Sequence, residues 1–100
     1  LWGRTNYGRA FAKFEESYAD ALGPKSSLLI LGDARSNYSD LHLGVLERLA
    51  GSARHAWWLN PEHRRHWDTG DSAATKYGAV VPMVECRNLI QLGEFVHDIL

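Results

Sequence analysis

One acidic side chain stands where parallel α/β sheets bind their ligands. Residues 28–31 form the apolar run Leu-Leu-Ile-Leu, and Gly32 and Asp33 follow it directly. An apolar run without polar alternation is typical of a strand that is buried on both faces of a parallel sheet. Ligands bind beyond the carboxyl ends of such strands. Asp33 is therefore predicted to take part in chemistry or in metal binding, although an Asp here can also close a turn through its own backbone.

The residues around this carboxylate are candidates for contact with a partner. Arg35, Ser36, Asn37 and Tyr38 follow it in a loop that a rigid strand would hold, and binding residues concentrate on such loops. Turn formation and solvation of the loop explain the same residues equally simply. Trp67 is predicted to lie in a longer loop, where an exposed Trp often anchors an interface. The alternative is that Trp67 folds back over the sheet.

A second polar cluster contains residue types that can bind zinc. His63 and His66 are three residues apart, with Asp68 and Asp71 nearby. On a helix the two imidazoles would share a face, yet no Cys or further His follows at the spacing of a zinc site. A flanking proline and a flanking glycine favour a loop. A solvated loop of mixed charge is therefore the preferred interpretation.

The elements that must position these residues can be predicted from apolar periodicity. Apolar side chains three and four positions apart indicate helices, and short apolar runs between turn residues indicate strands. Strands that alternate with helices favour a three-layer, Rossmann-like parallel sheet of the α/β class. The expected helices are residues 7–21, 40–51 and 89–99, with one turn in 72–77; the expected strands are 27–31, 56–59 and part of 80–86.

Polar residues and a proline mark the expected boundaries. Thr5 or Asn6, Asp40 and Asn88 each precede an apolar stripe and are predicted to cap the three helices. Pro82 removes a ladder donor, so the last strand either pairs only after it or lies at the edge of the sheet.

The domain is expected to extend beyond this sequence. The chain begins with Leu1, and its only methionine is Met83. A strand as apolar as residues 27–31 should not form an exposed edge. We therefore expect an N-terminal part that supplies neighbouring strands, and we interpret residues 1–100 as the C-terminal part of one domain. Without that part, the isolated chain should be only marginally stable.

Composition excludes several classes of protein. The net charge of −1 over 100 residues gives no electrostatic footprint for nucleic acid. No apolar run of 18 residues indicates a membrane span, and no charged-then-apolar leader is visible. The single cysteine, Cys86, cannot form an internal disulfide, which fits a reducing, cytoplasmic setting.

Five segments together resemble a known family. They are residues 3–8 (GRTNYG), 29–38 (LILGDARSNY), 57–62 (WWLNPE), 67–72 (WDTGDS) and 85–89 (ECRNL). In this order and at this spacing, they resemble the C-terminal half of a von Willebrand factor A (VWA) domain of the CoxE-like bacterial family. The resemblance covers nearly the whole chain.

The resemblance implies a metal-ion-dependent adhesion site (MIDAS) that holds Mg²⁺. In VWA domains the ligands come from an Asp-x-Ser-x-Ser loop, a Thr and a later Asp. Thr5 matches that Thr and Asp33 matches that Asp, whereas the Asp-x-Ser-x-Ser loop matches nothing here and is expected upstream. Hard oxygen ligands with open positions suit Mg²⁺. Two such ligands alone hold it poorly, so the isolated chain should bind Mg²⁺ weakly or not at all.

The function implied by the resemblance is non-catalytic. CoxE-like proteins resemble factors that work with MoxR-type AAA+ ATPases in maturing metalloenzymes, so such an ATPase and a client oxidoreductase subunit are the expected partners. A partner carboxylate would complete the metal sphere, and ATP hydrolysis would belong to the ATPase, because no Gly-x-x-x-x-Gly-Lys-Ser/Thr loop is present. The alternative is an α/β hydrolase or phosphotransfer enzyme that uses Asp33, although no Gly-x-Ser-x-Gly elbow is found. A scaffold with a degenerate site is a third possibility.

Overall fold

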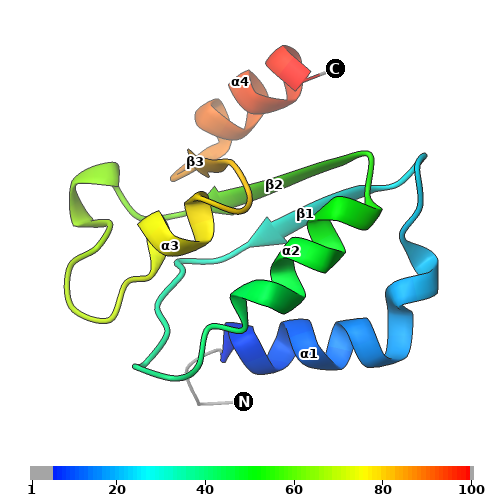
Figure 1. Ribbon diagram of the computed structural model, residues 1–100. Helices are drawn as coiled ribbons and strands as arrows, with labels where there is room; N and C mark the ends of the chain where they lie inside the picture. The colour runs from blue at the N-terminus through cyan, green and yellow to red at the C-terminus, as the bar shows by residue number, and fades with distance from the viewer. Residues whose placement is uncertain (1–5, 100) are drawn as a thin grey trace.

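Three parallel strands form one sheet in the order β1-β2-β3 (Figure 1). The computed structural model describes residues 6–99. The whole of β1 pairs with β2, and β3 pairs with the last three residues of β2. The carboxyl ends of all three strands therefore point to the same edge of the sheet. The strands are β1 (Ser27–Leu31), β2 (His55–Asn60) and β3 (Met83–Glu85).

Helices alternate with the strands, as the periodicity predicts. The first helical stripe ends in a 3₁₀ turn, and a second 3₁₀ turn lies in the long loop after β2. The helices are α1 (Tyr7–Tyr18), η1 (Ala19–Ala21), α2 (Leu43–Ser52), η2 (Arg64–His66), α3 (Ala74–Gly78) and α4 (Leu89–Ile99).

An aromatic cluster forms the core between the sheet and α1. The ring of Trp58 stacks on that of Tyr77, with 4.8 Å between centroids, and meets the edge of Phe11 at 5.8 Å. The ring centroid of Tyr7 lies 5.2 Å from that of Trp58. Trp58 and Tyr77 are fully buried, and Leu46 of α2 is buried beside them. This face of the sheet carries most of the apolar burial.

On the opposite face of the sheet, α4 packs against β2. Side chains alternate along β2, so Trp57 points away from the core around Trp58 and meets Phe95 of α4 at 5.6 Å. Helices therefore pack on both faces, which confirms the predicted three-layer α/β arrangement. Trp57 is only partly buried, whereas Trp58 on the other face is fully buried.

β1 is an edge strand of the described sheet, as β3 is on the other side. Leu28 and Ile30 face the core, whereas Leu29 is 50% exposed and Leu31 is 69% exposed. An open apolar groove of about 590 Å³ runs from these two leucines to Leu92 of α4. Within residues 6–99 the strand thus occupies the edge position that its composition argues against.

The helix starts are partly as predicted. The Oδ1 atom of Asn6 accepts from the backbone N–H of Arg9, so Asn6 caps α1. Asn88 caps α4 in the same way; Thr5 lies outside the described residues. The prediction for Asp40 is wrong: α2 begins only at Leu43, and the cap position is His42, in a left-handed conformation. Asp40 instead accepts from the N–H of His42 and closes a turn.

The carboxylate of Glu85, at the end of β3, joins three segments. It accepts hydrogen bonds from the backbone N–H of Arg64, from Gln91 of α4 and from Arg87. These contacts, chiefly the bond from Arg64, lower the pKa of Glu85 from its usual 4.5 to about 2. A lowered pKa stabilises the fold above pH 4.5, and this contribution is lost as the pH falls from 4.5 towards 2.

The Glu85→Gln variant is therefore expected to be less stable than the wild type at pH 6, with the difference shrinking below pH 4.5. Urea unfolding of both proteins at pH 6 and at pH 2.5 measures this change. A difference that stays constant across this range would mean that the charge of Glu85 does not contribute.

Candidate functional site

The Asp33 carboxylate is held through one of its two oxygens. Oδ1 accepts from the hydroxyl of Tyr7 at 3.2 Å and from the backbone N–H of Arg35 at 2.9 Å. Among residues 6–99, every hydrogen bond to this carboxylate goes to Oδ1. Since the side chain is only partly buried, Oδ2 is available to another donor or to a cation.

The backbone of Asp33 is fixed as well. Its N–H donates to the Tyr7 hydroxyl at 3.0 Å, and its carbonyl accepts from the side-chain amide of Asn60 at 3.1 Å. The indole of Trp58 donates to the carbonyl of Gly32 at 2.8 Å. The turn after β1 is therefore tied to α1 and to the end of β2.

Tyr7 and Asn60 are site residues that the sequence pattern does not single out. Asn60 is fully buried at the carboxyl end of β2, the same edge of the sheet that carries Asp33. Strand-end placement, which singles out Asp33, could have found Asn60 by the same rule. Tyr7 counts only as one residue of the apolar stripe of α1, and nothing in its spacing signals a polar contact.

The Tyr7 hydroxyl is a hydrogen-bond donor at neutral pH. Burial, and next the charge of Asp33, raise the pKa of Tyr7 from 10.0 to about 12. The hydroxyl therefore keeps its proton, and the bond to Oδ1 runs from phenol to carboxylate. A phenol is a poor general base at this pKa, so the pair serves to hold the carboxylate.

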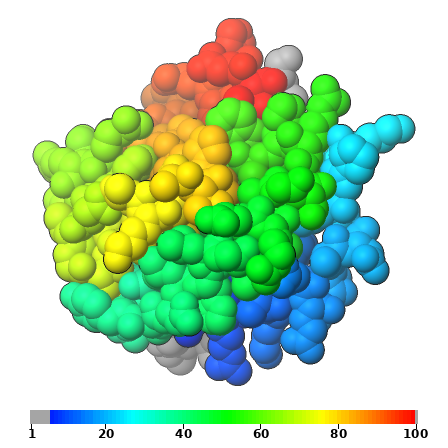
Figure 2. All heavy atoms as spheres, viewed as in Figure 1, coloured from blue at the N-terminus to red at the C-terminus, as the bar shows by residue number. Residues whose placement is uncertain are grey.

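The loop after Asp33 is hydrogen-bonded to the loop after β2. The carbonyl of Ala34 accepts from the N–H of Ala73 at 2.8 Å, and Arg35 forms an isolated bridge with Ser72. Oδ2 of Asp71 accepts from the N–H of Asn37 at 2.8 Å. Figure 2 shows these two loops side by side on one face of the molecule. Contacts distant in sequence thus build this surface.

Backbone strain is concentrated in the same loop. Ala34, Asn37, Tyr38 and His42 all have positive φ, between 51° and 62°. Left-handed non-glycine residues are uncommon and persist where surrounding contacts over-determine them. The loop shape is therefore set by the tertiary contacts around it.

Arg35 connects the two loops that form this surface. Its guanidinium binds both carboxylate oxygens of Glu62, each at 3.0 Å, and reaches Asp71 at 3.3 Å. It also donates to the carbonyl of Thr69. With its side chain 22% exposed, Arg35 clamps the 62–71 loop onto the loop of Asp33, and only its remaining surface could meet a partner.

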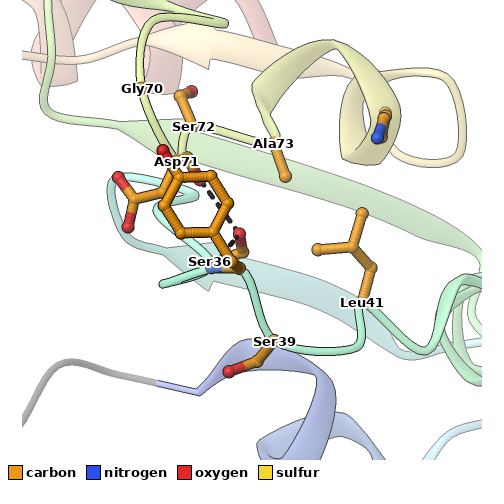
Figure 3. A pocket seen from close by; sticks show the side chains of 9 residues that line it. Ser36, Ser39, Leu41, Gly70, Asp71, Ser72 and Ala73 are labelled. Carbon is orange, nitrogen blue, oxygen red and sulfur yellow. Dashed lines mark hydrogen bonds between the residues drawn. The ribbon is translucent and has the colours of Figure 1, made fainter.

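Ser36 and Tyr38 line an open pocket of about 280 Å³ (Figure 3). The Ser36 hydroxyl donates to the carbonyl of Asp71 at 3.0 Å and accepts from the N–H of Tyr38. Tyr38 is 80% exposed, and Asn37 is exposed beside it. Lys76 of α3 also lines the pocket. Of the predicted partner-binding residues, Asn37 and Tyr38 are the most open to solvent.

Trp67 folds back over the protein. It is partly buried and packs against the core cluster. Its indole N–H donates to the carbonyl of Glu62 at 3.2 Å, and the guanidinium of Arg64 lies 5.1 Å from its ring. Of the two positions that its sequence context allows, Trp67 therefore occupies the one in which it tucks back.

Metal ligands are sparse in the described chain. No group of three or more His, Cys, Asp or Glu side chains in residues 6–99 is arranged to hold a metal ion, and this covers His63 and His66. Asp33 fits Mg²⁺ chemically, because its Oδ2 is a hard oxygen that accepts no hydrogen bond from these residues. Thr5, the other predicted ligand, lies outside the described residues.

Comparison with known proteins identifies the family. The family described as VWA domain containing CoxE-like protein matches residues 1–95. Searches of curated proteins and of solved structures found no match. None of the helices in residues 6–99 has the length and apolar character needed to cross a membrane. This family is generally non-enzymatic and is consistent with a role in protein interaction. Because the family match covers residues 1–95, the chain belongs to the family of VWA domain containing CoxE-like proteins.

Proposed function

We propose that this chain is the C-terminal part of a VWA domain that captures protein partners through a bound Mg²⁺ ion. Asp33 and Thr5 would hold the ion together with residues of an upstream Asp-x-Ser-x-Ser loop. The partners would be a MoxR-type AAA+ ATPase and a client oxidoreductase subunit, and the process would be the maturation of a metalloenzyme in the cytoplasm. The chain itself would catalyse no reaction.

The observation that carries this proposal is the geometry of Asp33. The carboxylate stands at the carboxyl end of β1, with Oδ1 occupied by two donors and Oδ2 unbonded among residues 6–99. A carboxylate that only closed a turn would need no donor beyond the Arg35 N–H. The second donor, Tyr7, comes from a distant element and fixes the carboxylate in place.

Mg²⁺ would supply an open coordination position for a carboxylate of the partner. The residues of this chain would then shape the surface around that contact. Arg35 holds two loops together, while Asn37 and Tyr38 are exposed in the loop that follows Asp33. A partner that reaches the ion would meet these exposed side chains.

The edge of β1 supports a domain that is completed by preceding sequence. One edge of β1 is unpaired among the described residues, and Leu29 and Leu31 are exposed next to the groove that reaches Leu92. A parallel strand beside β1 and a helix over the groove would bury these leucines, since parallel sheets carry helices on both faces. The Asp-x-Ser-x-Ser loop would enter the site from this side.

Mg²⁺ titration by calorimetry on the full-length protein tests the metal site, with Asp33→Ala as the variant. Loss of a direct ligand should weaken binding by more than the roughly 10- to 100-fold effect typical of outer-shell partners. Asp40→Ala is the matched control, because Asp40 is an 80% exposed acid in the same loop. We expect Asp40→Ala to bind like the wild type and the 100-residue chain alone to bind weakly or not at all.

Equal binding by the wild type and Asp33→Ala would remove Asp33 from the site. Absence of binding to the wild-type full-length protein would remove the adhesion-site mechanism altogether. If binding is lost in Asp33→Ala only, pull-down of the ATPase with and without Mg²⁺ becomes the next test. Capture that does not depend on Mg²⁺ would contradict the proposed mode of docking.

A further inference from the structure

Tyr7 connects the first turn of α1 to the Asp33 carboxylate. The hydroxyl donates to Oδ1 of Asp33 at 3.2 Å and accepts from the N–H of the same residue at 3.0 Å. Its one hydrogen and one of its lone pairs are thus both used. Contacts to both the backbone and the side chain of one residue restrict rotation about the Asp33 side-chain bonds.

These contacts select which carboxylate oxygen stays available. The Arg35 N–H is the second donor to Oδ1, at 2.9 Å. With two hydrogen bonds on Oδ1, the carboxylate is oriented rather than free to exchange its oxygens. Oδ2 is left for a cation, because within residues 6–99 no hydrogen bond reaches it.

The Tyr7 ring cannot easily move away from this position. Tyr7 is 7% exposed, and its ring is surrounded by those of Trp58 at 5.2 Å, Tyr77 at 6.3 Å and Phe11 at 6.4 Å. A phenylalanine would fill the same volume in this cluster. The hydroxyl is the only part of the side chain that the core packing does not require.

We propose that Tyr7 is a positioning residue for metal binding, which pins Oδ1 of Asp33 and presents Oδ2 to the cation. The inference rests on the proposed function, because it assigns Asp33 as the ligand. Tyr7 itself does not bind the ion. It stands two residues after Thr5 in the sequence.

The test compares Tyr7→Phe with Tyr77→Phe in the full-length protein. Both changes remove one tyrosine hydroxyl from the same core, but the Tyr77 hydroxyl donates to the carbonyl of Leu41 and does not touch Asp33. Calorimetric titration with Mg²⁺ should give a dissociation constant about 10- to 100-fold weaker for Tyr7→Phe, as for other groups that orient a ligand. Tyr77→Phe should bind Mg²⁺ like the wild type. Both variants are expected to melt at a lower temperature than the wild type, because each loses the hydrogen bonding of one tyrosine hydroxyl in the core.

Hydrogen exchange of the Asp33 amide, without metal, is the second readout. The amide should be protected in the wild type and in Tyr77→Phe, and should exchange faster in Tyr7→Phe. An unprotected Asp33 amide in the folded wild type would overturn the inference whether or not the variant folds. So would wild-type Mg²⁺ affinity in Tyr7→Phe, or an equal loss in both variants.

The two proposals fail in distinguishable ways. If the wild type binds Mg²⁺ and Asp33→Ala does not, but Tyr7→Phe binds normally, only the role of Tyr7 is overturned. If the wild type does not bind Mg²⁺, the proposed function fails and the positioning role falls with it.

Discussion

Replacing Trp58 with alanine is expected to lower the free energy of unfolding by about 3–5 kcal/mol, the usual cost of deleting a large aromatic side chain from a core. Trp58 is fully buried and contacts the rings of Tyr7, Phe11 and Tyr77. Its indole also donates to the carbonyl of Gly32. The change therefore leaves a cavity and also frees the turn that carries the candidate site. A loss of this size is a large fraction of the roughly 5–15 kcal/mol that stabilises a typical domain.

Trp57→Ala is the matched control for this prediction. Trp57 is the preceding residue of the same strand, lies on the opposite face and is only partly buried against Phe95. Its replacement should cost clearly less. Urea unfolding followed by circular dichroism measures both losses. Equal losses for the two variants would mean that the packing of α4 against β2 stabilises the protein as much as the aromatic core does.

Gly32→Ala is expected to disturb the candidate site. A Cβ at Gly32 would overlap the hydroxyl of Tyr7 and lie 2.8 Å from two carbons of its ring. Tyr7 is enclosed by the aromatic core, so it cannot move away without loosening its contacts. Overpacking of this kind costs about 1–3 kcal/mol. Because the displaced hydroxyl holds Asp33, Mg²⁺ affinity of the full-length protein should fall as well.

Gly51→Ala is the matched control for Gly32→Ala, because the added methyl group at position 51 does not collide with another side chain. Apart from its chain neighbours and the backbone of its own helix, no atom lies within 4 Å of a Cβ at Gly51, which is the next-to-last residue of α2. Alanine should therefore raise stability by about 0.5–1 kcal/mol, through its better helix propensity. Thermal unfolding of the two variants, together with Mg²⁺ titration, compares them. Normal stability and affinity in Gly32→Ala would contradict the close packing of Tyr7 against the turn.

Much of the fold follows from local patterns in the sequence. The apolar run 28–31 predicts β1, the stripe beginning at Tyr7 predicts α1, and Asn88 caps α4 as expected. These features depend on side-chain periodicity and on hydrogen bonds between residues close in the chain. Asp40 shows the limit of such reasoning: an Asp before an apolar stripe can cap a helix or close a turn. Contacts with the rest of the molecule then decide between the two, and the cap position falls at His42.

Asp33 can be singled out from local sequence, because the strand-end rule depends only on which residue follows an apolar run. Arg35 can be found as a member of the loop, but not as a clamp that binds Glu62 and Asp71, which lie 27 and 36 residues further along the chain. The position of Trp67 likewise does not follow from its neighbours in the sequence.

The sequence by itself determined the order of elements, the α/β class and the acidic residue at the end of β1, since each of these is written in residues near one another. Only the tertiary structure decided what surrounds that acid. It brought the Tyr7 hydroxyl and the Asn60 amide, 26 and 27 residues away, to Asp33. Such contacts depend on how helices and strands pack, and periodicity does not record which polar atom will meet which across a core.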